Sequence, residues 1–285
     1  MVDASAALFD LLVLVLAALL PALIYLSWVR QSERLGREPW GLLLRLFAFG
    51  ALGATIIAGV LELILVDVGN AVSVHYPAPE FAFLNGHSTL GAFFLVLVIA
   101  PFVEEGLKAG GVVQYSANLR RLADGPVFGA AVGLGFGFFE TLLYGLGAFL
   151  AGGLAAGLTL IFVRSISSVL LHGSSTAMFG RGYSASRFEK RTGATAGYYL
   201  LAVAMHASFN FLASLGAVAA FVGLPSSLGQ YADLVGLLAA IAFAFGAIEH
   251  VRSVIAQSDF PGASAVHPRF RPPSVQSRSG NSPRR

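Results

Sequence analysis

Seven stretches of the chain consist almost entirely of apolar residues, and short polar connections separate them. They cover residues 7–28, 42–66, 84–108, 127–150, 154–180, 194–217 and 231–251. Each is about as long as the roughly 20 residues with which a helix crosses a bilayer. Because backbone polar groups in lipid must be satisfied within the segment, the pattern predicts seven transmembrane helices. The expected fold class is all-α, a polytopic transmembrane helical bundle.

Lysine and arginine occur in alternate connections. They flank or fill the first, third and fifth connections and the C-terminal tail, whereas the N-terminus and the other connections carry none. Arg164, inside the fifth stretch, is the exception. Since basic residues concentrate in cytoplasmic loops, this alternation places the N-terminus outside the cell and the C-terminus in the cytoplasm.

The composition agrees with a membrane protein and excludes several other classes. Hydrophobic residues make up 56% of the chain and charged residues 12%, against about 25% charged in soluble domains. The net charge of +3 does not indicate a nucleic-acid partner, because the basic residues follow the connections. The lack of cysteine excludes disulfides and thiolate metal sites. Residues 1–254 are expected to form one transmembrane domain, and 255–285, rich in Pro, Ser and Arg, a disordered basic cytoplasmic tail.

Ionisable and amide side chains interrupt four consecutive apolar stretches. They are Glu104, Glu105 and Lys108 in the third, Glu140 in the fourth, Arg164 and His172 in the fifth, and His206 and Asn210 in the sixth. An acid or a lysine at a helix centre costs roughly 2.5–3.5 kcal/mol, so such residues face a bundle interior or a wet cavity. Lys108 stands four residues after Glu104 and three after Glu105, where it can neutralise one acid. A helix end at the membrane surface would explain these charges equally well.

One shared polar cavity is the simplest hypothesis for these residues, and its composition suits hydrolysis. Glu104 or Glu105 is expected to act as general base, with His172, His206 and Asn210 donating hydrogen bonds to water or to an oxyanion. Alternatively, Glu105, His172 and His206 form a His₂Glu set that binds a divalent metal such as zinc. Residue identity does not separate these mechanisms. Arg164 is interpreted as a structural partner of Glu140.

Four motifs then carry a resemblance to a known family. They are Glu104-Glu105-x-x-Lys108, Gly135-Phe136-Gly137-Phe138-Phe139-Glu140, His172 followed by Phe179-Gly180, and His206-Ala-Ser-Phe-Asn210. This ordered set, within about residues 95–215, resembles the PrsW family of bacterial and archaeal membrane proteases. These are distant relatives of the CAAX prenyl protease and bacteriocin-immunity superfamily.

The resemblance implies an intramembrane endopeptidase in the cell membrane of a prokaryote. Its implied partners are the lipid bilayer and a membrane-anchored protein substrate, such as an anti-sigma factor in a signalling cascade. By motif position, Glu104 and Glu105 would be the essential pair, with His172 and His206 as their partners. Glu140 is also assigned to the site, although Thr141 follows it where the family often has asparagine.

Two other classes of function remain open from the residues alone. Glu and His side chains inside membranes also form proton relays, so a proton-coupled transporter or a non-proteolytic immunity-type protein could use the same cavity. A non-catalytic scaffold with this fold is a further reading. Transporters often consist of two related halves, and no such repeat is visible here.

Overall fold

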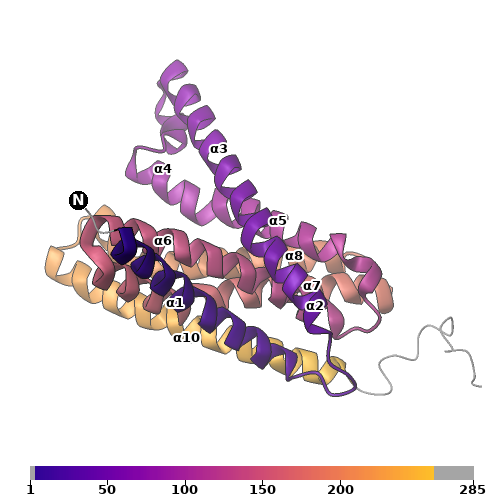
Figure 1. Ribbon diagram of the computed structural model, residues 1–285. Coiled ribbons are helices and arrows are strands. Elements are labelled where there is room, and N and C mark those ends of the chain that lie inside the picture. Colours follow the sequence, from indigo (N-terminus) through magenta and orange to yellow (C-terminus); the bar gives the residue numbers. More distant parts are fainter. Residues whose placement is uncertain (1–3, 260–285) are drawn as a thin grey trace, which may run out of the picture.

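The computed structural model describes residues 4–259, and within this range the chain is helical with no strand (Figure 1). The helices are α1 (Ala4–Arg30), α2 (Trp40–Ala48), η1 (Phe49–Ala54), α3 (Thr55–His75), η2 (Pro79–Leu84), α4 (Thr89–Phe94), η3 (Leu95–Ile99), α5 (Ala100–Gln114), η4 (Ser116–Asn118), α6 (Asp124–Ser165), α7 (Ser168–Phe188), α8 (Ala194–Ala213), α9 (Leu215–Phe221) and α10 (Ser226–Ser258). The predicted all-α membrane bundle is confirmed.

Six helical segments in the described part of the chain are long and apolar enough to cross a membrane. One of them, Asp124–Phe188, has 65 residues and is interrupted at Gly153, whose φ of 77° lies in the left-handed region. The chain reverses direction there. Gly145, before the turn, lies against the helix after it, and Gly157, after the turn, lies against the helix before it. Counting both arms of this hairpin gives seven passes, which agrees with the apolar pattern.

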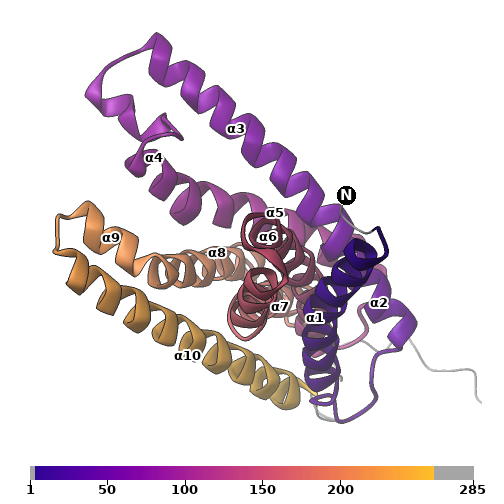
Figure 2. The same ribbon diagram turned by 60° about the vertical axis from the view of Figure 1, so that its left-hand side comes forward.

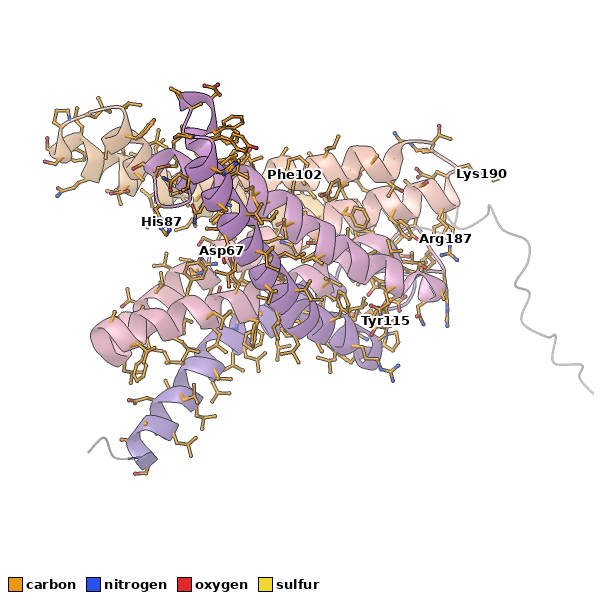
Figure 3. The ribbon with its side chains drawn as sticks, turned by 90° about the horizontal axis from the view of Figure 1, so that it is seen from above. Asp67, His87, Phe102, Tyr115, Arg187 and Lys190 are labelled. Atoms are coloured by element: carbon orange, nitrogen blue, oxygen red, sulfur yellow. The ribbon has the colours of Figure 1, made fainter. Side chains whose placement is uncertain are left out.

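The connections alternate between two ends of the bundle. The start of α1 and the end of α10 lie at opposite ends, as an odd number of passes requires (Figure 1). Tyr115, Arg187 and Lys190, in or beside connections predicted to be cytoplasmic, lie at one end, away from Asp67 and His87 (Figure 3). The basic connections therefore share a side. Which side faces the cytoplasm stays a prediction from the charges.

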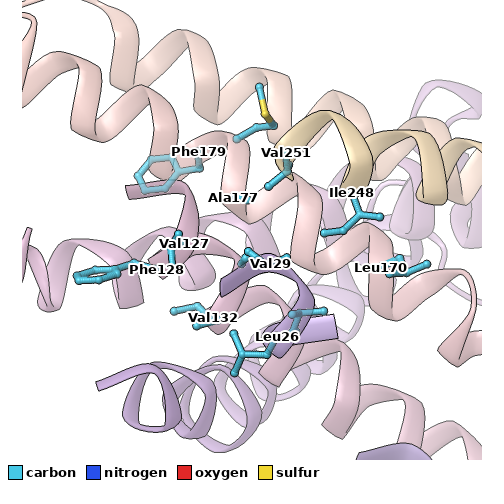
Figure 4. Close-up of a cluster of buried hydrophobic side chains, with 14 of the residues drawn as sticks. Leu26, Val29, Val127, Phe128, Val132, Leu170, Ala177, Phe179, Ile248 and Val251 are labelled. Atoms are coloured by element: carbon cyan, nitrogen blue, oxygen red, sulfur yellow. The ribbon is translucent and has the colours of Figure 1, made fainter. Parts of the chain in front are cut away.

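The core of the bundle is a cluster of buried aliphatic and aromatic side chains, mostly from α1, α2, α5, α6, α7, α8 and α10 (Figure 4). The labelled members include Leu26, Val132, Leu170 and Ile248, all fully buried. Large apolar side chains also cover the outside of the helices, as on Leu8 and Ile24. This is the distribution that a lipid solvent allows, since apolar surface is not penalised there.

Helices α6 and α7 approach closely along a row of glycines. Gly125, Gly129, Gly133 and Gly137 of α6 face α7, and a Cβ atom added at Gly133 would lie 2.0 Å from the His172 carbonyl oxygen. Small residues at four-residue spacing let two membrane helices approach this closely. Because no side chain separates the two backbones, the helix with Glu140 lies directly against the helix with His172.

Two π-helical segments precede the helices that lead into the polar region. Segment η1 joins α2 to α3, and η3 joins α4 to α5. Helix α3 and the α4–η3–α5 segment lean away from the remaining helices at the η2 end (Figure 2). Since α5 continues to Gln114, Glu104 and Lys108 lie inside a helix, and the alternative of a helix end is wrong.

A group of charged residues, here called the loop cluster, links the segments that follow α1, precede α6 and end α10. It consists of Glu33, Glu38, Arg121, Asp124 and Asp259. Arg121 lies 3.0 Å from Glu33, 2.9 Å from Asp124 and 2.9 Å from Asp259, and so connects three distant segments. Asp259 also accepts the backbone N–H groups of Arg34 and Leu35.

The folded part of the chain extends further toward the C-terminus than predicted. Helix α10 continues to Ser258, and Asp259 is 1% exposed, so 255–259 belong to the folded domain rather than to a disordered tail. The sequence pattern missed this because Asp259 follows the last apolar stretch and its partners lie far away in the chain. The rest of the predicted tail, 260–285, lies outside the described residues.

Candidate active site

The third membrane segment brings two acids and a lysine into the interior of the bundle. Glu104, Glu105 and Lys108 of α5 are 6%, 1% and 0% exposed. The Lys108 Nζ atom lies 2.8 Å from Glu105 Oε1 and 3.5 Å from Glu104 Oε2. Lys108 therefore neutralises mainly Glu105, and the expected i,i+3 and i,i+4 pairs are both present.

Glu105 is held by side chains from three helices. Its oxygens accept hydrogen bonds from Ser175 Oγ at 2.9 Å and Thr176 Oγ1 at 3.2 Å, both on α7. Oε1 also lies 3.1 Å from His206 Nδ1 on α8. With Lys108 as a further partner, Glu105 has its acceptor capacity largely used. It lies behind the cavity wall and fixes the positions of its neighbours.

Glu104 lies between the two histidines. Its Oε2 atom is 3.9 Å from His172 Nδ1 and 3.9 Å from His206 Nε2. The ligand atoms of Glu104, His172 and His206 all lie within 4.8 Å of one another, and all three residues are buried. The predicted metal set with Glu105 as its carboxylate is therefore revised: Glu104 is the acid placed with the two imidazoles.

Carboxylates orient both imidazole rings. The Lys108 ammonium, 2.8 Å from His172 Nδ1, can only donate, so Nδ1 is the accepting nitrogen. His172 Nε2 then carries the proton and donates to Glu140 Oε2 at 2.8 Å. His206 correspondingly donates from Nδ1 to Glu105, which leaves the lone pair of Nε2 directed to the Glu104 side. Carboxylates behind ligating histidines are typical of metal sites.

Glu140 is itself anchored by an arginine. Arg164 Nη2 lies 2.5 Å from Glu140 Oε2 and 2.9 Å from Ser168 Oγ, and its guanidinium stacks over the Tyr144 ring. The predicted partnership of Arg164 with Glu140 is confirmed. Glu104, Glu105, Lys108, Glu140, His172 and His206 are here called the cavity cluster.

Glu104, Glu140, His172 and His206 of this cluster line a cavity of about 260 Å³. Its lining includes Glu62, Glu104, Glu140, Tyr144, Arg164, Ser168, His172, His206, Asn210 and Ser214. Five of the six residues predicted to be catalytic line it, and Glu105 lies behind the wall. The expectation of one shared polar cavity between four consecutive membrane passes therefore agrees with the structure.

Asn210 has a different contact from the expected one. Its Nδ2 atom donates to the Val96 carbonyl oxygen at 2.8 Å, within the π-helical segment η3. Such segments leave carbonyls poorly satisfied and occur often beside functional sites. Asn210 thus joins α8 to the segment that leads into α5, and its predicted role in binding an oxyanion stays a prediction.

The sequence analysis missed Glu62, Ser168, Ser175 and Thr176. The three hydroxyl residues carry no distinctive signal, because serine and threonine are common in membrane helices. Glu62 did carry one, as an acid within the second apolar stretch. It lines the cavity beside Glu104 and Glu140.

The residues around the cavity suit a divalent metal. Two imidazoles and a carboxylate form the donor set of many catalytic zinc sites, in which neighbouring ligand atoms lie about 3.3 Å apart. The 3.9 Å separations are slightly wider, and Lys108 would have to release His172 Nδ1.

Comparison with known proteins supports the same reading. A family model described as PrsW family intramembrane metalloprotease matches residues 38–247. The chain belongs to the PrsW family. It is also 27% identical over 206 residues to Protease PrsW of Clostridioides difficile (strain 630), an alignment that covers 70% of this chain and 78% of that protein. No solved structure gives a significant match.

Membership of the PrsW family makes the chain a peptidase and a multi-pass membrane protein. The match includes every member of the cavity cluster, which lies between 104 and 206. Family membership therefore favours the peptidase over the transporter and scaffold readings that the residues alone left open.

Proposed function

We propose that this PrsW-family peptidase hydrolyses a peptide bond in a membrane-anchored protein, with Glu104, His172 and His206 as its reactive centre. A single-span signalling protein such as an anti-sigma factor is the expected kind of substrate. The observation that supports this most directly is the approach of two carboxylate-oriented imidazoles to Glu104 beside a cavity. Such a cavity admits water and part of a peptide in an otherwise apolar bundle.

Glu104, His172 and His206 are the residues that would hold a divalent metal such as zinc. When bound, the metal would lower the pKa of a coordinated water and polarise the scissile carbonyl. Glu105 accepts the proton of His206 Nδ1 in a hydrogen bond, which leaves His206 Nε2 unprotonated. Glu140 accepts from His172 Nε2, which leaves His172 Nδ1 unprotonated. Lys108 lies close enough to both acids of α5 to limit the cost of burying two charges on adjacent residues.

A cleavage assay in proteoliposomes tests the proposal. Purified full-length protein is combined with tagged single-span substrates, and fragments are compared for the wild type, Glu104→Gln, Glu105→Gln and His206→Ala. Fragments are expected from the wild type and should fall below detection in the three variants. His250→Ala is the matched control, since His250 is an exposed histidine of α10 that does not line the cavity. Cleavage that persists in all three variants would show that the site is elsewhere.

A chelator experiment tests the metal. Metal content is measured on purified protein before and after dialysis against chelator, together with cleavage. We expect loss of both, recovery with zinc, and low metal content in His206→Ala. Full activity in metal-free protein would exclude the metal and leave Glu104 as the base that takes a proton from water.

A further inference from the structure

Glu62 is a cavity acid that the proposed mechanism does not use. It lies on α3, within an apolar run of a segment long enough to cross the membrane. It lines the cavity with Glu104 and Glu140. An ionisable residue at such a position is expensive to keep and usually serves a function.

Glu62 differs from the other two acids that line the cavity. Glu104 is close to Lys108, and Glu140 is paired with Arg164. Within the described part of the chain, Glu62 forms no hydrogen bond or ion pair, and its Oε1 atom is buried without a partner. Because buried polar atoms are normally paired, an acceptor left free in a cavity indicates a partner that arrives from outside the chain.

The substrate of an intramembrane protease brings suitable donors. A peptide bond inside a transmembrane helix is shielded, so a few residues around it must unwind before it can be hydrolysed. Unwinding frees backbone N–H groups that have no water to bind at membrane depth. Each acid of the cavity cluster forms an ion pair with Lys108 or Arg164. Glu62 forms no ion pair within the described residues, and its Oε1 atom is free to accept.

The position of α3 supports this reading. Helix α3 lies on one side of α5 and α8 lies on the other (Figure 2). The cavity lining combines Glu62 from α3 with His206 from α8. A peptide between these walls would have the reactive centre on one side and the free acceptor on the other.

We propose that Glu62 is a substrate-binding residue that accepts hydrogen bonds from backbone N–H groups of the unwound substrate segment. This inference rests on the proposed peptidase site. It requires an acceptor atom and does not require a negative charge. If Glu62 instead bound a basic side chain of the substrate, its negative charge would be required. Glu62→Gln, which replaces the carboxylate with a neutral amide, therefore separates the two hypotheses.

The test compares Glu62→Gln, which keeps a strong oxygen acceptor, with Glu62→Met, which keeps the length but offers only a weakly accepting thioether sulfur. Both are assayed as full-length protein in proteoliposomes with a cleaved single-span substrate. We expect Glu62→Met to raise KM by about 10- to 100-fold, the range for leaving a buried donor without its partner. We expect Glu62→Gln to stay within a few-fold of the wild type. Asp67→Asn is the matched control, since it removes another acid from α3 that does not line the cavity.

Two readouts separate substrate binding from a structural role. Photo-crosslinking of the uncleaved substrate, measured in a Glu104→Gln background, should fall with Glu62→Met and not with Glu62→Gln. Metal content and thermal stability should match the wild type in both variants. A loss of stability or metal equal to the loss of activity would overturn the inference, and so would an unchanged KM in Glu62→Met.

The remaining outcomes are also decisive. Equal damage from Glu62→Gln and Glu62→Met overturns the backbone-acceptor role and favours a basic side chain as the ligand. Wild-type cleavage with normal Glu62→Met kinetics defeats this inference alone. A wild type that neither cleaves nor crosslinks any single-span substrate defeats the proposed function, and this inference with it.

Discussion

The cavity cluster and the loop cluster are both buried groups of acids around few cations, yet they are built for different purposes. Each contains three residues whose donor atoms lie close enough to hold a metal ion. In the loop cluster, Arg121 already bridges the acids, and backbone N–H groups fill remaining acceptor positions. In the cavity cluster, the acids are combined with imidazoles beside open volume. Proximity of acids alone therefore does not identify a reactive site.

The largest expected difference is in activity. Glu104→Gln and Glu33→Gln each remove one charge from a three-residue group of possible ligands. Glu104→Gln should reduce the rate of substrate cleavage by roughly 10²–10⁴-fold, the contribution typical of an acid–base group. Glu33→Gln should leave the rate of correctly folded protein within about two-fold. Equal losses of cleavage rate in both variants would show that the two clusters do not differ in their role in the reaction.

The second difference is in stability. Arg121→Leu removes the guanidinium that joins Glu33, Asp124 and Asp259. Breaking a buried ion pair by removing one partner costs about 3–5 kcal/mol, so the protein should unfold at a clearly lower temperature in detergent. Activity per folded molecule should persist at a temperature where the variant remains folded. A variant as stable as the wild type would mean that the loop cluster does not hold these segments together.

The third difference is in metal affinity. Glu140→Gln keeps the shape of the residue that orients His172 but weakens its acceptor and its pair with Arg164. Loss of such a partner typically lowers metal affinity about 10- to 100-fold, which titration of the purified protein with zinc would measure. Glu38→Gln, in the loop cluster, should leave zinc affinity unchanged.

The smallest expected effect is a pH dependence of stability. Burial raises the pKa of the Glu38 carboxyl from its ordinary 4.5 to about 7, and Asp124 and Glu33 add to the shift against the opposing effect of Arg121. Burial also raises the pKa of Glu33. The folded state therefore binds these protons more tightly than the unfolded state. Stability should fall as pH rises from 4.5 through 7.

Melting temperatures in detergent at pH 5.5 and pH 8 would measure this effect. A change of about 1 kcal/mol corresponds to roughly 2–4 °C in a chain of this size. Glu38→Gln should flatten the dependence, whereas Glu80→Gln, at an exposed acid in η2, should not. A wild type whose stability rises with pH in this range would contradict the assigned direction.

The sequence predicts the passes and the membership of the cavity cluster well because the membrane makes both patterns strict. Apolar length alone identifies seven passes, and ionisable residues inside them must share a polar interior. It does not predict which of two adjacent acids meets the histidines. Glu104 and Glu105 differ by about 100° around α5, and only the positions of α7 and α8 decide which one faces His172.

Other features depend on contacts that no local pattern records. The hydrogen bond from Asn210 to the Val96 carbonyl depends on the π-helical segment η3, which the sequence pattern does not predict. Arg121 and Asp259 are separated by 138 positions in the chain and meet only in the folded bundle. The free acceptor of Glu62 is visible only when the partners of every neighbouring acid are known.

The glycine row between α6 and α7 has a consequence for how this enzyme can be lost. One added methyl group at Gly133 would collide with the backbone of His172 itself and wedge the two helices apart. Glu140 and its imidazole partner would then separate although neither had been altered. Inactivating substitutions are therefore expected also at these glycines, which carry no reactive group and act only by letting the two backbones touch.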